Sequence, residues 1–167
     1  MDRNVLGIKN SQGLTLLELL VAITVLVILM AMAVPVFLSF REESDLNNNA
    51  KEIINALRIA QSKTLSSEEA SRWGVYFATS TGPHQYVLFR GDSYQSRATS
   101  SDEIHQLPLS VEIYQINLWG KDEIVFQKIT GFVTSTEQSG NISLRLKKAP
   151  TKTRTIYITN FGQVGLQ

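Results

Sequence analysis

The stretch that decides the fold is residues 13–40, which read GLTLLELLVAITVLVILMAMAVPVFLSF. From Leu19 to Phe40 this segment contains no charged residue, and between Leu19 and Val34 only Thr24 is polar. A helix from Leu19 to Phe40 would be roughly 33 Å long, which matches a bilayer hydrocarbon core of about 30 Å. We therefore expect a helix that can span a membrane.

The residues before this segment, MDRNVLGIKNSQG, are polar and carry Arg3 and Lys9 against the single acid Asp2. Basic residues that precede a membrane span tend to stay on the cytoplasmic side. This bias predicts that the leader stays in the cytoplasm and that the chain after Arg41 crosses the membrane.

Glu18 is the informative residue of the segment, because a carboxylate at the start of an apolar run is costly unless it has a partner. A solvated position at the lipid headgroups is the plain alternative. A conventional secretory signal, cut after Ala33 within Ala31–Ala33, is a second alternative for the segment, and a single-pass anchor is a third. Neither of the last two explains Glu18.

The string Gly13-Leu14-Thr15-Leu16-Leu17-Glu18 before a long apolar helix resembles the signature of type IV pilins and type II secretion pseudopilins. In that family a membrane peptidase, the prepilin peptidase, cuts after the glycine and the new amine is methylated. The resemblance implies cleavage and N-methylation between Gly13 and Leu14. It also implies that Glu18 pairs with the amine of a neighbouring subunit. Leu14 stands where the family more often has phenylalanine.

The expected pairing is physically reasonable, because opposite charges attract strongly in a low-dielectric setting and tolerate a missing partner poorly. Such a pair would set the register between subunits in a filament. Pro35 lacks an amide donor, so we expect it to kink or loosen the helix without ending the apolar run. A new helix that starts at Pro35 is the alternative, and the family resemblance favours the kink.

Beyond Arg41 the apolar residues recur at spacings of four and three, which places them on one helical face. They are Leu46, Ala50, Ile53, Leu57, Ala60 and Thr64. We expect this amphipathic half of the helix, residues 41–65, to pack on a β-sheet, and a free coiled-coil stalk is the alternative.

Strand-like sequence follows the helix. Trp73–Ala78 and Tyr86–Arg90 flank a turn-forming stretch and predict a hairpin. The polar stretch 91–106 predicts a loop. Four further strand candidates are Leu109–Leu118, Glu123–Ile129, Asn141–Lys147 and Thr155–Thr159. This order predicts an α+β, pilin-like fold in which a long N-terminal helix packs on an antiparallel β-sheet domain.

Two further tracts resemble a narrower branch of the family, that of minor pseudopilin H and FimT-like proteins. One is Asn55–Gln61, which reads NALRIAQ, and the other is Ile156–Ile158 leading into residues 161–164.

No residue pattern indicates catalysis or a bound metal or cofactor. The chain has no cysteine, which excludes a disulfide framework and a thiolate zinc site. His84 and His105 lack metal-ligand spacing, and the acids Asp92, Asp102, Glu103, Asp122 and Glu123 lack the order of a calcium loop. No Gly-x-Ser-x-Gly elbow or phosphate loop is present, so we expect a protein that is not an enzyme.

A local basic cluster surrounds residues 149–151 and consists of Arg145, Lys147, Lys148, Lys152 and Arg154. A solvated hairpin tip is its plain interpretation, and contact with DNA phosphates is the alternative. The tail after Thr159 contains no basic residue, and the net charge of +1 does not favour a polyanionic partner. Nucleic acid is therefore not expected as a partner.

The sequence thus predicts four parts, namely a cleaved leader at 1–13, a membrane and filament-core helix at 14–40, its amphipathic continuation at 41–65 and a β-rich domain at 66–167. The predicted function is that of a minor pilin or pseudopilin in a type IV pilus or a type II secretion pseudopilus. Its expected partners are other pilins, the prepilin peptidase, an inner-membrane assembly platform and membrane lipid. We expect a single-pass plasma-membrane protein with its C-terminal domain outside the cytoplasm. A DNA-binding competence pilin and a secreted protein released after Ala33 are the alternatives.

Overall fold

The structure is a computed structural model, and it describes residues 15–133 and 138–167. It begins with a single helix, α1 (Leu16–Leu65), which runs without interruption through Pro35. The chain forms two compact units, residues 1–39 and residues 40–167. Both units share α1, and each is described by itself.

The first unit is helical from Leu16 onward, and its side chains in the described part, residues 15–39, are all exposed. The helix contains a stretch that is long and apolar enough to cross a membrane, judged by length and composition. Pro35 lies inside the helix. The expectation that the helix continues past Pro35 agrees with this continuity.

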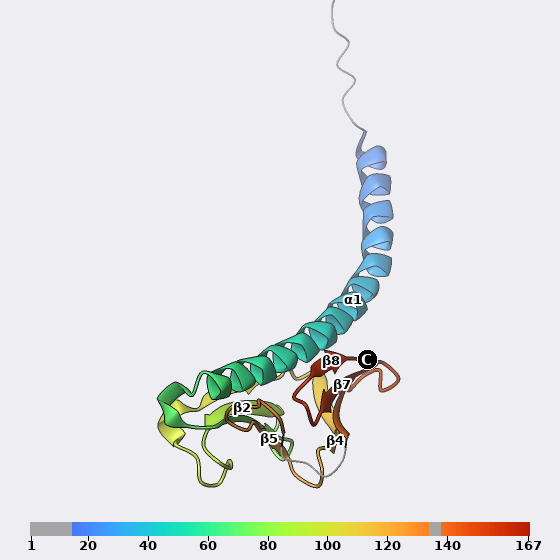
Figure 1. Cartoon of the computed structure of the whole chain (residues 1–167). Helices are drawn as coiled ribbons and strands as arrows, with labels where there is room; N and C mark the ends of the chain where they lie inside the picture. Colours follow the sequence, from blue (N-terminus) through green and yellow to red (C-terminus); the bar gives the residue numbers. More distant parts are fainter. Residues whose placement is uncertain (1–14, 134–137) are drawn as a thin grey trace, which may run out of the picture. The chain divides into compact units, whose positions relative to one another are not determined.

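In its described residues, the second unit combines the C-terminal half of α1 with eight strands in two antiparallel four-stranded sheets. Sheet A has the order β3-β2-β1-β5, and sheet B has the order β4-β6-β7-β8. The elements after α1 are η1 (Glu68–Ala70), β1 (Trp73–Ala78), β2 (Gln85–Arg90), η2 (Thr99–Ser101), β3 (Glu103–Gln106), β4 (Val111–Asn117), β5 (Glu123–Val125), β6 (Ser139–Leu146), β7 (Thr153–Thr159) and β8 (Val164–Leu166). Within this unit, Figure 1 shows the end of α1 lying across the strands.

The predicted fold class is confirmed, since a long N-terminal helix packs on antiparallel sheet structure. Its apolar stripe decides the packing. All six residues of the predicted stripe are fully buried, with 0% of their surface exposed. All of them except Thr64 share one core with inward-facing residues of both sheets, among them Phe77, Leu144 and Ile156. Burial of each large side chain of the stripe contributes about 1.5–3 kcal/mol, so packing on the domain is favoured over a free stalk.

The strands differ from the predictions in several respects, and β8 was not predicted as a strand. The predicted loop 91–106 is wrong for residues 103–106, which form β3 and pair with β2 at the edge of sheet A. The predicted strand 123–129 is wrong beyond Val125, because the chain turns at Ile129 and Gly131, where φ is positive. The strands also divide between two sheets where one was expected, because the β4–β5 connection leads from sheet B to sheet A.

The backbone after β7 approaches α1 closely at one glycine. Gly162 follows β7 at φ +77, and a Cβ there would run into the Gln61 side chain and the Gly131 carbonyl. The Gln61 Nε2 group donates a hydrogen bond of 2.9 Å to that same carbonyl. Only glycine combines this backbone conformation with so little space.

Candidate functional site

The described part of α1 starts with a capped turn that contains Glu18. Thr15 precedes the helix, and its Oγ1 accepts a hydrogen bond of 3.2 Å from the Glu18 backbone N–H. Threonine followed three residues later by glutamate is the sequence signature of a capping box. A carboxylate in the first turn is also stabilised by the helix dipole. The sequence reasoning missed Thr15, although the Thr-x-x-Glu spacing could have indicated it.

The predicted cleavage residues, Gly13 and Leu14, lie outside the described residues. Glu18 and Pro35 lie inside them, on the same exposed helix segment. The structure contains one copy of the chain, so the predicted pairing of Glu18 with a neighbour's amine stays a prediction.

The surface of the first unit is apolar on every side of the helix. Its large apolar side chains from Leu16 to Phe40 are each at least 50% exposed, and Leu16 reaches 82%. A helix that is apolar all round is normally covered by lipid or by protein, and an exposed apolar surface of this extent marks such a contact. Nothing in the part of the chain that the structure describes covers this segment, so it requires an external partner.

The two hydroxyl groups between Leu19 and Phe40 are bonded within the helix. The Thr24 hydroxyl donates to the Leu20 carbonyl at 2.8 Å, and the Ser39 hydroxyl donates to the Val36 carbonyl at 2.9 Å. Backbone and hydroxyl groups that bond inside one helix can enter hydrocarbon without a large penalty. Both hydroxyls thus suit an apolar environment.

The predicted basic cluster forms the end of the β6–β7 hairpin, and most of its cations are bound to other parts of the domain. Lys152 Nζ lies 2.5 Å from Glu43 Oε2, and Lys148 Nζ lies 3.2 Å from Glu42 Oε1. Both carboxylates belong to α1, so the hairpin is held against the helix.

The two arginines of the cluster are engaged as well. Arg145 Nε donates to Glu112 Oε1 of β4 at 2.6 Å, and Arg154 Nε donates to Asn47 Oδ1 of α1 at 2.5 Å. Lys147 is exposed. This arrangement gives the cluster a structural role that the sequence alone does not indicate.

The hydrogen bond and the charge of Lys152 hold the pKa of Glu43 below its ordinary value, and the charge of Arg154 adds to the effect. The Glu43 carboxylate therefore stays ionised at neutral pH and keeps its contact with the hairpin.

The two histidines have structural contacts. His84 Nδ1 accepts a hydrogen bond of 3.0 Å from the Ile113 N–H, which ties the β1–β2 turn to β4. The His105 ring stacks on Tyr86 with 4.9 Å between centroids. Among the described residues, no group of three or more His, Asp or Glu side chains could hold a metal ion.

The acids of residues 91–123 are also engaged individually. Asp102 accepts from Arg97 at 2.8 Å, and Glu123 accepts from the Tyr94 N–H at 2.6 Å. The Arg97 guanidinium lies over the Tyr94 ring. These contacts order the segment between β2 and β3.

A shallow groove lies between α1 and the β2–β3 edge of sheet A. It is lined by Glu52, Asn55, Ala56, Ile59, Tyr86, Leu88, Glu103 and His105. Burial, with a smaller effect of Glu52, raises the pKa of Tyr86 to about 12. A tyrosine with that pKa is neutral at physiological pH, so it is a poor base.

Comparisons with known proteins agree with this geometry. Residues 8–34 match the family described as the prokaryotic N-terminal methylation motif. A search of curated proteins found no match. Among solved structures, the type IV minor pilin FimU of Pseudomonas aeruginosa aligns in one crystal form with a TM-score of 0.57 and 15% identity, covering 77% of this chain and 92% of FimU.

The minor pseudopilin EpsH from the type 2 secretion system of Vibrio cholerae also aligns. Its TM-score is 0.52 at 10% identity, with 74% of this chain and 96% of EpsH covered. The shared feature is the fold, a helix packed on antiparallel strands.

Proposed function

We propose, from the chain's place in the type IV pilin-like superfamily, which its methylation motif and its fold both support, that it is a minor pilin or pseudopilin. In this role the apolar half of α1 first anchors the chain in the plasma membrane. It then becomes the core of a helical filament, where it packs against the same segment of other subunits. The C-terminal domain lies outside the cytoplasm.

The observation that carries the proposal is the apolar surface around residues 16–40 on a helix that continues into a packed domain. A secretory signal would be removed and would not need to be continuous with the helix of the domain. A filament core requires both features, because the subunit must leave the lipid and bury the same surface in protein.

Processing by a prepilin peptidase after Gly13 supplies the remaining element. It would create an ammonium group on Leu14, near the carboxylate of Glu18. Inside a filament of apolar helices the amine of one subunit and Glu18 of another attract strongly, and an unpaired charge there is costly. The pair would select one register between neighbours.

The parent machine is a type IV pilus or a type II secretion pseudopilus. FimU is a type IV minor pilin and EpsH is a pseudopilin of a type 2 secretion system, and the two align with similar TM-scores. The fold alone therefore favours neither of the two machines. An assembly platform in the membrane would extract the subunit from the bilayer.

Mass spectrometry of the chain extracted from membranes tests the proposal. We expect a mature chain that begins at Leu14 with a methylated amine. A mature chain that begins at Val34 would contradict it and would indicate a secreted protein. Expression with and without a prepilin peptidase provides the control, because only the cut after Gly13 should depend on that enzyme.

A further inference from the structure

The domain carries a group of cations at the point where the chain leaves the apolar segment. Phe40 is the last apolar residue of that segment, and Arg41, Glu42 and Glu43 follow directly. At about 1.5 Å of helix rise per residue, Glu42 lies roughly 3 Å along the axis from Phe40. If Leu19–Phe40 crosses a bilayer, these three residues lie at the lipid headgroups.

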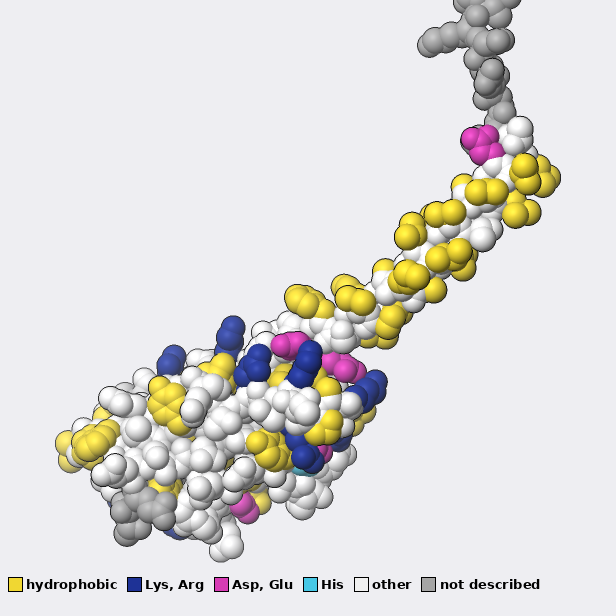
Figure 2. All heavy atoms as spheres, turned by 90° about the vertical axis from the view of Figure 1, so that its right-hand side faces the viewer, with side chains coloured by type: hydrophobic (Ala, Val, Ile, Leu, Met, Phe, Trp, Pro, Cys, Tyr) yellow, Lys and Arg dark blue, Asp and Glu magenta, His cyan; other side chains and the backbone are white. Residues whose placement is uncertain are grey.

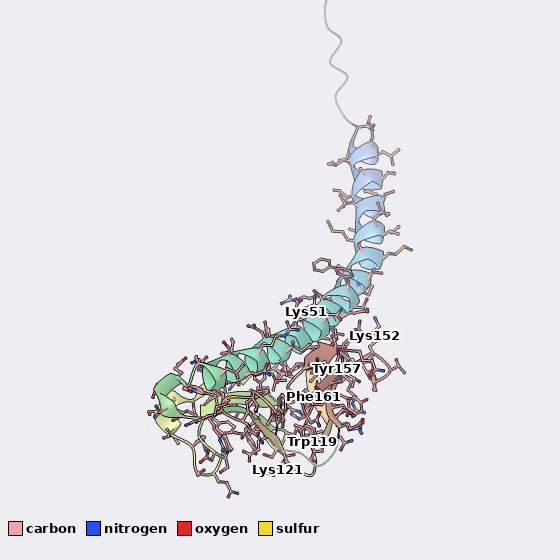
Figure 3. The ribbon with its side chains drawn as sticks, in the orientation of Figure 1. Lys51, Trp119, Lys121, Lys152, Tyr157 and Phe161 are labelled. Carbon is pink, nitrogen blue, oxygen red and sulfur yellow. The ribbon has the colours of Figure 1, made fainter. Side chains whose placement is uncertain are left out.

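The β6–β7 hairpin reaches this same place. Lys148 and Lys152 contact Glu42 and Glu43 at 3.2 Å and 2.5 Å. In Figure 3, Lys152 projects from the hairpin beside the helix of the domain. The ion pairs fix the hairpin tip next to Glu42 and Glu43, which follow the apolar segment directly in the sequence.

The charge at this place is positive, and the two lysines are more exposed than the glutamates with which they pair. The side chain of Lys148 is 81% exposed, whereas that of its partner Glu42 is 24% exposed. Arg41 and Lys147 are exposed and have no ion pair among the residues that the structure describes. Figure 2 shows Lys and Arg side chains gathered over this end of the domain, with carboxylates between them.

The acids nearby do not cancel this charge. Glu42 and Glu43 are engaged with the hairpin, and Asp45 is the next acid along the helix. Arg154, in β7 of the same hairpin, adds a further positive charge, 3.8 Å from Glu43. Five cations thus face three carboxylates in this region.

We propose that Arg41, Lys147, Lys148 and Lys152, the basic collar, bind the phosphate groups of anionic phospholipids where the chain leaves the membrane. Basic residues next to a membrane span are attracted to an anionic lipid surface, and lysine side chains are long enough to reach it. The collar holds the domain on the membrane before assembly and releases it when the subunit moves into a filament. This inference rests on the membrane anchoring in the proposed function.

Single cysteine labels on the full chain test the collar, because the native chain contains no cysteine. A fluorescent label at Thr151→Cys reports the hairpin tip, and one at Ser66→Cys reports the far end of α1, about 35 Å further along the helix axis from Glu43. The chain is placed in lipid nanodiscs of phosphatidylcholine, with or without phosphatidylglycerol. The lipids carry a nitroxide quencher on the headgroup.

We expect phosphatidylglycerol to raise quenching of the Thr151→Cys label about threefold and to leave that of the Ser66→Cys label unchanged. High salt should reverse the increase, because it screens charges at the surface. The double variant Lys147→Gln, Lys148→Gln should abolish the increase. The matched double variant Arg72→Gln, Lys121→Gln, which removes the same charge elsewhere, should keep it.

A label at Ile28→Cys, with quenchers on the lipid acyl chains, separates the two proposals. If this label is not quenched, the anchoring itself is wrong. If it is quenched while phosphatidylglycerol leaves the Thr151→Cys label unchanged, the anchoring holds and the collar is overturned. Duplex DNA is also added to the Thr151→Cys chain in discs of phosphatidylcholine alone. If the chain binds DNA, loses that binding in the Lys147→Gln, Lys148→Gln variant and does not respond to phosphatidylglycerol, the collar is overturned in favour of nucleic acid.

Discussion

The two halves of α1 belong to one uninterrupted helix, yet their apolar residues are arranged and covered differently. From Leu16 to Phe40 the apolar residues surround the helix and are exposed, whereas the six-residue stripe from Leu46 to Thr64 lies on one face and is fully buried. The sheets of its own domain cover the apolar stripe of the second half. Among the residues that the structure describes, 15–133 and 138–167, nothing covers the first half.

This difference shows how composition assigns a partner to a helix. A stripe of about 100° can be covered by a single sheet, but an apolar surface on all sides requires surroundings on all sides. Lipid provides such surroundings before assembly, and a ring of identical or related helices provides them in a filament. Both states of the proposed function follow from this one property.

The largest expected effect comes from replacing leucine by alanine, once in each half of α1, and comparing the two losses of stability. Leu57→Ala should lower the free energy of unfolding of the domain by about 3 kcal/mol, because Leu57 is fully buried and alanine leaves a cavity. Urea unfolding in detergent solution, followed by the fluorescence of buried Trp73, measures it. Leu26→Ala, at a site that is 52% exposed, is the control and should change this free energy by less than about 0.5 kcal/mol. Equal losses would show that the halves do not differ as described.

The substitution Gly162→Ala tests the contact between the second half of α1 and the sheets. We expect a loss of about 2–3 kcal/mol in unfolding free energy, since alanine combines a strained backbone with a clash against Gln61. Gly120→Ala is matched in backbone angle, with φ +76, but has open space around it. It should therefore cost only about 1 kcal/mol. Equal costs would mean that the Gln61 contact does not hold the helix to this turn.

A smaller effect concerns the ion pair that holds the hairpin to the first turns of the second half. A double-mutant cycle of Glu43→Gln and Lys152→Gln should give a small favourable coupling, because the pair is partly exposed and screened by solvent. The more exposed pair of Glu42 and Lys148 is the comparison and should couple more weakly. The order of the two couplings is the test, and a reversed order would contradict the geometry.

The smallest effect is a pH dependence at the same carboxylate. The pKa of Glu43 is lowered in the folded domain, so the unfolded chain binds more protons between the two pKa values and stability rises with pH there. The contribution is present above the ordinary pKa of glutamate and is lost as pH falls through the lowered one. Subtracting the stability of Glu43→Gln from that of the native chain, at each pH, isolates it. A difference that grows as the pH falls would have the wrong sign.

Local patterns predicted much of the fold. The stripe from Leu46 to Thr64 could be read from its spacing, since the helical period alone determines which side chains share a face. The first hairpin was clear because turn residues separate two β-rich runs. β1 has its predicted bounds, and β2 starts at Gln85, one residue early.

The missed parts depend on long-range contacts. β3 consists of Glu103, Ile104, His105 and Gln106, all exposed, so it shows no buried alternation and exists because β2 offers an unpaired edge. The ion pairs of Lys148 and Lys152 join residues more than a hundred positions apart. No local pattern could show that the basic cluster is held by α1.

At the site, the sequence predicted the importance of Glu18 at the start of the apolar helix. It did not predict the role of Thr15, whose capping hydrogen bond appears only in the structure. This bond matters for the choice of experiment, because the first helical turn, which Thr15 caps and in which Glu18 lies, can be important without any role in assembly. Glutamine keeps the capping-box pattern and removes the charge. Glu18→Gln therefore separates the two roles.

The most direct test is the amount of Glu18→Gln chain recovered in sheared filaments, from cells with a prepilin peptidase and the parent assembly system. We expect a loss of about tenfold or more, since the neighbour's buried ammonium would be left unpaired, while the membrane-bound amount and the mature N-terminus stay unchanged. Glu52→Gln, which removes a carboxylate from the exposed face of the other half of α1, should assemble normally. Native recovery of Glu18→Gln in the filament fraction would contradict the assembly chemistry proposed for this helix.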